Sequence, residues 1–368
     1  MNKIQKERSG ISTIVMVILV AVIIIVGASA VYVVLTKDDD IKSGPVTVTD
    51  AYGRVVTIES SNRIASVNAV TTEIICGIGG YSKLKGVTED TNTYKIQDYI
   101  IGLPNDGFPK SIVDGFNNKT IVNLGGMYMI SAESILLASP DLVIAAVYGT
   151  SDATIAQLES LGIPTIICKD NSLMENVHFN IDLIGKVIGK ESEAKQLSSQ
   201  LKNATDKVIN WAKSLGVEGP SVGVLSSFGS GTTYAYSDGF WKLEGVRLLG
   251  GTNAFSEVPG MYAIVSKESI ARNEPDVIIN NAYNSKAELD ATYTDPVLKS
   301  ISAIENNRVY SFFDTANTVA GSTSQGNVNS LAFMAMFMYE DYLDFEIDHE
   351  MGNDYADYLK KFWNQINS

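Results

Sequence analysis

The stretch Ser131–Ser151, which reads SAESILLASPDLVIAAVYGTS, has a near copy at Ser266–Lys286, which reads SKESIARNEPDVIINNAYNSK. A Gly-Met-Tyr triplet precedes each copy, at residues 126–128 and 260–262. Two similar supersecondary units in one chain predict two similar lobes. Among the residues that the copies share are Ser131/Ser266, Glu133/Glu268, Ser134/Ser269, Ile135/Ile270, Pro140/Pro275, Asp141/Asp276 and Tyr148/Tyr283.

The repeated unit predicts a loop, a helix and a strand, in that order. Ser131 and Ser266 can each cap a helix whose first turn carries an acid, Glu133 or Glu268. A Pro-Asp pair ends the helix, and an apolar run follows, LVIAAV in one copy and VIINNA in the other. Such a run is typical of a buried parallel strand, so each lobe is expected to be an α/β sheet.

A long helix is expected between the lobes. In ESEAKQLSSQLKNATDKVINWAKSLG, apolar residues recur at spacings of three and four from Ala194 to Leu215, and Gly216 ends the pattern. We therefore predict two α/β lobes bridged by one long α-helix, with a ligand cleft between them and little hinge motion. The predicted parts are an anchor with its cytoplasmic stub (1–37), a linker (38–45), an N-terminal lobe (46–175), a linking helical segment (176–216) and a C-terminal lobe (217–368).

The N-terminus contains a candidate membrane anchor. The segment Ile11–Leu35 has 25 residues and no charge, which is enough to cross a hydrocarbon core of roughly 30 Å as a transmembrane helix. Lys3, Lys6 and Arg8 precede it, so the positive-inside rule places the globular part outside the cell, on a single-pass cell membrane protein. The stretch ERSGISTIVMVILV also resembles archaeal pilin-type signals, which implies cleavage after Gly10. A plain anchor and a processed pilin-like helix both remain open.

Composition excludes several functions. The net charge of −14 argues against nucleic acid as a partner, because phosphate backbones repel an acidic protein. The two histidines, His178 and His349, are too few for a His-rich zinc or manganese site. Cys76 and Cys168 lie in apolar runs and are interpreted as small buried hydrophobic residues, with a disulfide as the alternative.

Three stretches carry a resemblance to a known family. RIASVNAVTTEIICGIGGYSKLKGVTE, SAESILLASPDLVIA with LESLGIPTII, and SKESIARNEPDVII resemble, in this order, the substrate-binding proteins of iron-siderophore and cobalamin ABC importers. The resemblance implies two Rossmann-like lobes bridged by a long helix, no catalysis and no intrinsic cofactor. It implies a metal chelate, either a corrinoid or an iron-siderophore, as ligand. The implied protein partner is an ABC permease dimer with its ATPase subunits.

The resemblance also suggests site residues. It places Met127, Tyr128 and Tyr262 where family members present side chains to the ligand, and it implies that Glu133 and Glu268 dock onto arginines of the permease. Helix-dipole stabilisation is the alternative role of these two acids. The full set of candidate ligand contacts is Asn68, Tyr94, Met127, Tyr128, Phe228, Tyr234, Tyr236, Trp241 and Tyr262.

Three other functions are weighed against this interpretation. A haem held by Met127 and Met261 would use the same fold, and so would a structural or adhesive surface protein built on a pilin-like helix. An extracellular enzyme is disfavoured, because the sequence has no convincing catalytic triad, metal cluster or phosphate-binding loop. The stretches expected to line the ligand cleft contain almost no arginine or lysine, which favours a nearly neutral corrinoid over an anionic siderophore as the ligand.

Overall fold

The structure is a computed structural model. The predicted anchor Ile11–Leu35 lies outside the residues that it describes. Within the described part of the chain, no helix is both long enough and apolar enough to span a membrane. The described residues are 44–89, 114–115, 117–126, 130–147, 150–170, 174–229, 231–238, 240–260, 262–280, 286–312, 324–351 and 355–368.

The N-terminal lobe is built on a five-stranded sheet in which every neighbouring pair of strands is parallel. All five residues of its internal strand β6 are buried, as the apolar run LVIAA predicted. The strand order is β5-β4-β3-β6-β7. The strands are β3 (Ile64–Val67), β4 (Leu84–Val87, after a short 3-10 helix at Tyr81–Lys83), β5 (Val122–Asn123), β6 (Leu142–Ala146) and β7 (Thr165–Cys168).

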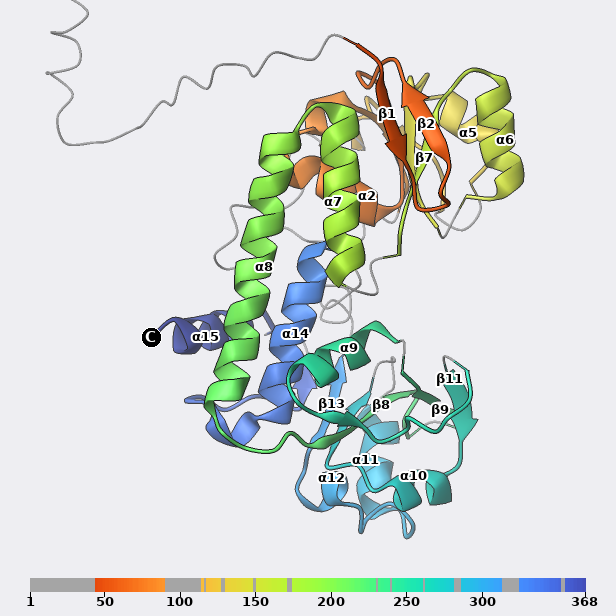
Figure 1. The fold of residues 1–368 in the computed structure, drawn as a ribbon. Helices are drawn as coiled ribbons and strands as arrows, with labels where there is room; N and C mark the ends of the chain where they lie inside the picture. Colours follow the sequence, from red (N-terminus) through yellow and green to blue (C-terminus); the bar gives the residue numbers. More distant parts are fainter. Residues whose placement is uncertain are drawn as a thin grey trace, which may run out of the picture. The chain divides into compact units, whose positions relative to one another are not determined.

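Helices cover both faces of this sheet (Figure 1). Alternate residues of β6 enter two separate core layers, because successive side chains of a strand point to opposite faces. Val143 packs in the layer of Ile135 and Ile155, and Ile144 packs in the layer of Ile74. The first layer contains α5 (Ala132–Leu136) and α6 (Asp152–Ser160), and the second contains α2 (Ala69–Gly77) and α7 (Met174–Ile188).

An antiparallel hairpin of β1 (Val46–Thr49) and β2 (Val55–Ile58) opens the lobe. Asp50 holds its turn, since Oδ1 accepts the backbone N–H groups of Tyr52 and Arg54, each at 3.0 Å. The Ala51 N–H donates to the Ile167 carbonyl at 2.8 Å and attaches the turn to β7.

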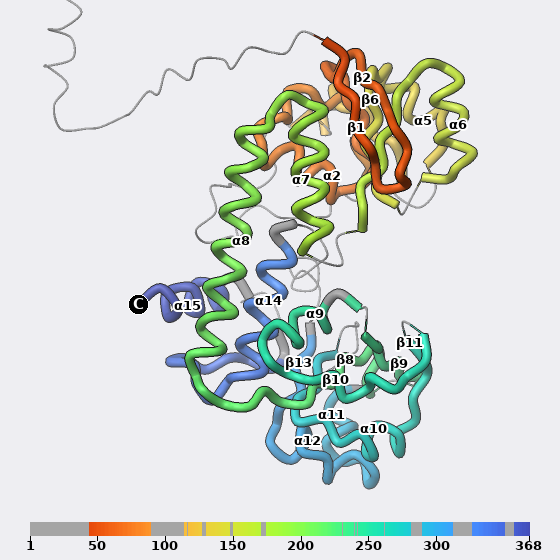
Figure 2. Tube along the Cα trace, viewed as in Figure 1, coloured from red at the N-terminus to blue at the C-terminus, as the bar shows by residue number. Residues whose placement is uncertain are grey.

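The linking segment consists of two helices, α7 and the 24-residue α8 (Glu191–Ser214). Gly189, with φ of 72°, lies in the short turn between them. A Cβ on Gly185 would lie 2.3 Å from the Cβ of Ala194, so glycine is required where the two helices touch. Helix α8 also packs against α14 (Ser324–Met338) of the C-terminal lobe, and Figure 2 shows the two helices side by side.

The C-terminal lobe has a mixed sheet of seven strands. Strands β8, β12, β13 and β14 run parallel to one another, whereas β9 runs antiparallel to both of its neighbours, β8 and β11. The main order is β11-β9-β8-β12-β13-β14, and β10 pairs with β8. The strands are β8 (Ser221–Ser226), β9 (Thr233–Tyr236), β10 (Thr252–Asn253), β11 (Tyr262–Val265), β12 (Val277–Asn280), β13 (Val309–Phe312) and β14 (Glu350–Met351).

This sheet also has two core layers. Val224 and Ile279 pack in a layer with Phe333 of α14, whereas Leu225 and Ile278 pack in the opposite layer. The first layer includes α9 (Trp241–Leu248), α14 and α15 (Tyr355–Asn367), and the second includes α10 (Lys267–Asn273), α11 (Lys286–Thr294) and α12 (Ser302–Glu305). A 3-10 turn at Glu340–Tyr342 follows α14.

The sequence repeat is a structural repeat. Ser131 and Ser266 cap α5 and α10 as predicted, each accepting a backbone N–H three residues ahead at 3.2 Å. Asp141 and Asp276 precede β6 and β12 and bind the chain at the start of the neighbouring strand. The Asp141 carboxylate accepts the Arg63 N–H at 2.9 Å, and the Asp276 carboxylate accepts the Ser221 N–H at 2.9 Å. The matched residues therefore hold equivalent strand pairs in the two lobes.

The two cysteines are free and buried, as their apolar surroundings predicted. Burial raises the pKa of both thiols, Cys76 and Cys168, far above the usual range. Both act as small apolar side chains in the core.

Candidate functional site

Three tyrosines that the sequence singled out lie together on the C-terminal lobe. Tyr234 and Tyr236 belong to β9, and Tyr262 opens the adjacent strand β11, opposite Tyr236. The ring centroid of Tyr262 lies 5.6 Å from that of Tyr234 and 5.9 Å from that of Tyr236. Phe240 stacks on Tyr236 at 3.8 Å between centroids. We call these four residues the aromatic cluster.

Strand geometry explains why these rings share one face. Ala235, between the two tyrosines of β9, is fully buried in the core, so its neighbours in the strand face the other way. Ile264 lies opposite Tyr234 across the strand pair. Tyr262 is 57% exposed and Ile264 is 68% exposed, so the face is open to solvent. Sequence reasoning missed Ile264, although the alternation in YAIV places it on the same side as Tyr262.

Hydrogen bonds fix the loops beside the cluster. The hydroxyl of Ser237, directly after β9, donates to the carbonyl of Gly260, shortly before β11. The Asn253 amide donates to the Asp238 carboxylate at 3.0 Å. Phe240, which the sequence analysis also missed, follows in this loop and stacks back on the strand. Contacts within the C-terminal lobe therefore fix the position of the aromatic cluster.

The cluster suits a flat, apolar ligand. Its four rings and Ile264 carry no formal charge, and aromatic faces stack favourably on other planar groups. An exposed apolar patch of this kind is typical of a binding surface.

Phe228 corrects the sequence prediction. Its side chain is 1% exposed and packs in the core layer of Leu225 and Ile278. Its backbone N–H donates to the Asn280 side chain at 3.2 Å. Phe228 thus stabilises the loop after β8 from inside and has no surface to offer a ligand.

Asn68 has a clear structural role. It is 5% exposed, and its Oδ1 accepts the Val70 N–H at 2.8 Å, which caps α2. Its φ of 135° is unusual for a residue other than glycine, so the turn between β3 and α2 is strained. Its contact with a ligand stays a prediction.

Several other predictions are not tested by the geometry. Tyr94, Met127, Tyr128 and Met261 lie outside the described residues. Trp241 is the first residue of α9, directly after Phe240. Their ligand contacts stay predictions.

The two predicted docking acids occupy equivalent, exposed positions at the starts of α5 and α10. Hydrogen bonds from its own backbone N–H and from Ser131 lower the pKa of Glu133. The corresponding bonds from its own backbone N–H and from Ser266 lower the pKa of Glu268. Both carboxylates are therefore negatively charged at neutral pH. Gln157 also donates to Glu133 at 3.3 Å.

Within the described ranges, no group of three or more histidine, cysteine, aspartate and glutamate side chains could hold a metal ion.

Comparison with known proteins identifies the family. Residues 85–314, well over half of the chain, match the family model described as periplasmic binding protein. The chain belongs to the periplasmic binding protein family. Members serve ABC importers as substrate-binding proteins and not as enzymes, which removes the enzyme alternative.

Individual relatives agree with this membership. An ABC transporter substrate-binding lipoprotein of Bacillus subtilis (strain 168), YvrC, is 25% identical over 292 residues, which are 78% of this periplasmic binding protein and 84% of YvrC. A vitamin B12-binding protein of Yersinia pestis (strain Pestoides F) is 22% identical over 240 residues, covering 65% of this chain and 76% of that protein. The apo structure of the periplasmic heme-binding protein RhuT from Roseiflexus sp. RS-1 has a TM-score of 0.58 and 21% identity, and the match covers 76% of this chain and 99% of RhuT. The likeness to RhuT supports the predicted two-lobed α/β fold.

Proposed function

We propose that this periplasmic binding protein captures a bulky metal chelate, of corrinoid type, and delivers it to an ABC permease. The aromatic cluster is the observation that carries this proposal. Its rings contact one another and carry no formal charge, and a large planar ligand can lie against their exposed part, above all against Tyr262. The similarity to a vitamin B12-binding protein gives independent support for a corrinoid.

The charge of the surface distinguishes between metal chelates. An anionic siderophore is usually bound through charge-assisted hydrogen bonds from arginine or lysine. The aromatic cluster and Ile264 provide no such cation. A corrinoid or another nearly neutral chelate therefore matches this surface better than an anionic iron-siderophore.

Haem is the second candidate ligand. Haem is also flat, and the fold is similar to that of a heme-binding protein. Met127 and Met261, one in each Gly-Met-Tyr triplet, would supply thioether ligands to the iron. Bound haem would show a Soret absorption band, which distinguishes this alternative from a corrinoid.

Delivery requires a contact with the permease dimer and its ATPase subunits. Glu133 and Glu268 are exposed, ionised and equivalent in the two lobes. We propose that each docks onto an arginine of one permease subunit, since paired opposite charges favour encounter and register. The segment Ile11–Leu35 is proposed to hold the protein on the outer face of the cell membrane.

The decisive experiment is mass spectrometry of small molecules retained by the full-length protein after purification in detergent. We expect a cobalt corrinoid, and the Tyr262→Ala variant should retain less of it. A Soret band would instead identify haem. A purified protein that retains nothing and binds neither vitamin B12 nor haemin would favour the structural or adhesive alternative.

A further inference from the structure

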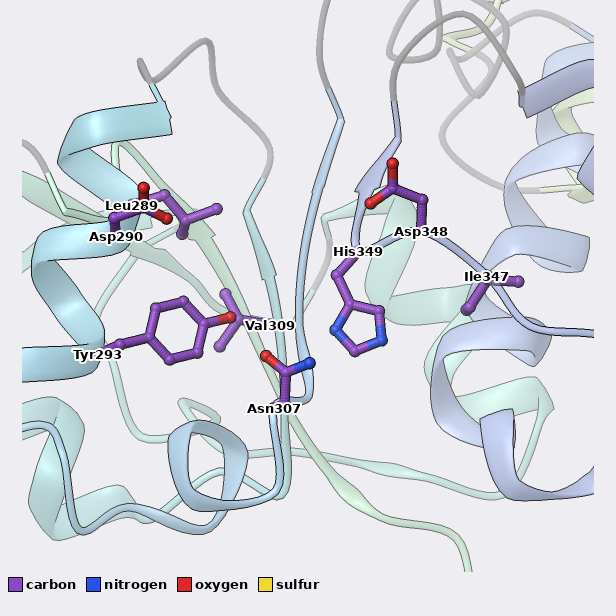
Figure 3. A pocket seen from close by; sticks show the side chains of 8 residues that line it. All are labelled: Leu289, Asp290, Tyr293, Asn307, Val309, Ile347, Asp348 and His349. Carbon is purple, nitrogen blue, oxygen red and sulfur yellow. The ribbon is translucent and has the colours of Figure 1, made fainter.

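The C-terminal lobe contains a cavity of about 380 Å³, lined in part by Asp290, Tyr293 and His349 (Figure 3). Asp290 and Tyr293 take part in interactions within the protein, and Nε2 of His349 lies 3.0 Å from Oε1 of Glu340. These interactions hold the side chains in the wall of the cavity, and we assign it no ligand. An exposed turn of the N-terminal lobe carries a stronger signal.

Two triplets of the chain match the acceptor pattern for N-linked glycosylation, in which an asparagine lies two residues before a serine or threonine. They are Asn118-Lys119-Thr120 and Asn203-Ala204-Thr205. Such triplets often arise by chance, so the pattern alone does not identify a modified residue. The structure distinguishes between the two triplets, because it presents their side chains differently.

The first triplet lies on an exposed turn. All four residues of 117–120 are exposed. The backbone turns at Lys119, whose φ is 60°, and the N–H of Thr120 donates to the carbonyl of Gly115 at 2.8 Å. The Thr120 hydroxyl donates to the same carbonyl at 3.2 Å, which leaves its own lone pairs as acceptors. The amide of Asn118 and the hydroxyl of Thr120 are therefore both accessible to an enzyme that approaches from outside.

The second triplet lies within helix α8 and differs in its third residue. Asn203 is exposed, but Thr205 is only 8% exposed and its hydroxyl is buried. Residues two apart on a helix point in nearly opposite directions, because one turn takes 3.6 residues. In the folded protein the second triplet therefore cannot present its asparagine and its hydroxyl to one enzyme.

Asn118 lies away from the N-terminal-lobe residues that the proposed function uses. It precedes β5 and so lies toward the amino end of that strand. Gly126, the first residue of the Gly-Met-Tyr triplet, follows the carboxyl end of β5, and Glu133 comes after it at the start of α5. A bulky group on Asn118 therefore extends from the opposite end of the sheet.

We propose that Asn118 is N-glycosylated on the outer side of the cell membrane. The donor is an oligosaccharide joined to a lipid diphosphate. Nδ2 of Asn118 forms a bond to C1 of the first sugar, and the bond between C1 and the diphosphate oxygen breaks. The lipid diphosphate leaves with the electron pair, and the amide loses one proton to a base of the transferring enzyme. The proposal rests on the orientation proposed for Ile11–Leu35, which places the lobe outside the cell.

The test is mass spectrometry of peptides from the full-length protein, purified from the cells that naturally produce it. We expect the Asn118 peptide to carry an oligosaccharide and the Asn203 peptide to be unmodified. Protease added to intact cells shows separately whether the lobe lies outside. An unmodified Asn118 peptide in a protein that this protease digests would overturn the glycosylation and leave the orientation intact. A protein protected from the protease, with Asn118 unmodified, would overturn both. Equal modification of Asn203 would refute the selection by structure.

Variants assign the modified atom. Asn118→Gln should remove the mass of one oligosaccharide from the intact protein. Asn117→Gln is the matched control, because Asn117 is an exposed neighbour with Lys119, and no hydroxyl, two residues ahead. The control should keep the oligosaccharide. Thr120→Ser retains the hydroxyl and should keep it too, whereas Thr120→Val should lose it. A Thr120→Val protein that is modified as the wild type is would refute the assignment to this triplet.

Discussion

Replacement of Tyr262 by alanine tests the aromatic cluster most directly. Tyr262 contacts the rings of Tyr234 and Tyr236 on one side and leaves 57% of its surface exposed. Because this residue begins the edge strand β11, its truncation removes ligand contact without opening a cavity in the core.

The size of the effect can be worked from that exposure. An aromatic side chain offers about 200 Å² in total, so 57% corresponds to roughly 110 Å² that a ligand can cover. At about 25 cal/mol per Å², covering half to all of this area contributes about 1.4 to 2.8 kcal/mol. The expected loss of affinity is therefore about 10- to 100-fold.

The assay is titration calorimetry of the full-length protein with vitamin B12, and with haemin in parallel. Tyr81→Ala is the matched control, because Tyr81 is 43% exposed but precedes β4, at the amino end of the N-terminal sheet. We expect the control to bind as the wild type does. If Tyr262→Ala binds both compounds with unchanged affinity, the aromatic cluster is not the ligand surface.

Three further predictions concern delivery and stability. The double variant Glu133→Arg/Glu268→Arg should bind vitamin B12 normally but abolish its uptake by cells, since like charges would meet at the permease. Uptake at the wild-type rate would leave helix-dipole stabilisation as the role of these two acids. Burial lowers the pKa of Lys242 to about 7. Between about pH 7 and about pH 10 the unfolded chain therefore binds more protons than the folded one. In that range the free energy of unfolding should rise with pH, by up to about 1.4 kcal/mol per pH unit. Urea denaturation across this range should show the rise in the wild type but not in Lys242→Met, and an equal rise in both would contradict the assignment. Asp141→Ala should lower the free energy of unfolding by about 1–3 kcal/mol, because the Asp141 carboxylate accepts hydrogen bonds from Ser60, Asn62 and Arg63. Asp276→Ala, which removes a hydrogen bond from Ser221, should lower it by less. The reverse order in denaturant melts would be evidence against this account.

The repeated elements could be predicted because their signals are local. An N-cap serine, an acid in the first turn and a Pro-Asp pair before an apolar run lie within one short stretch of chain, and each acts on its immediate neighbours. Hence α5 and β6, and α10 and β12, form where the sequence places them. The free state of the cysteines followed similarly from their apolar surroundings.

The binding surface could be predicted only in part. The sequence proposed Tyr234, Tyr236 and Tyr262 by residue type and resemblance, but their proximity depends on the pairing of β9 with β11. Phe228 looked equivalent to these tyrosines in the sequence, yet it enters the core because its loop turns inward after β8. Side-chain direction in a loop is set by such nonlocal contacts, which no sequence period encodes.

The sequence by itself determined the two α/β lobes, the long helix and the equivalence of Glu133 and Glu268, because periods of 2.0 and 3.6 residues and helix caps are properties of neighbouring residues. Tertiary structure alone decided that Gly185 is the contact point between α7 and α8, and that Asp290 and His349 line one cavity. Asp290 and His349 are far apart in the chain, and the contact at Gly185 depends on how α8 folds back on α7, so both arise only when helices and strands pack in three dimensions.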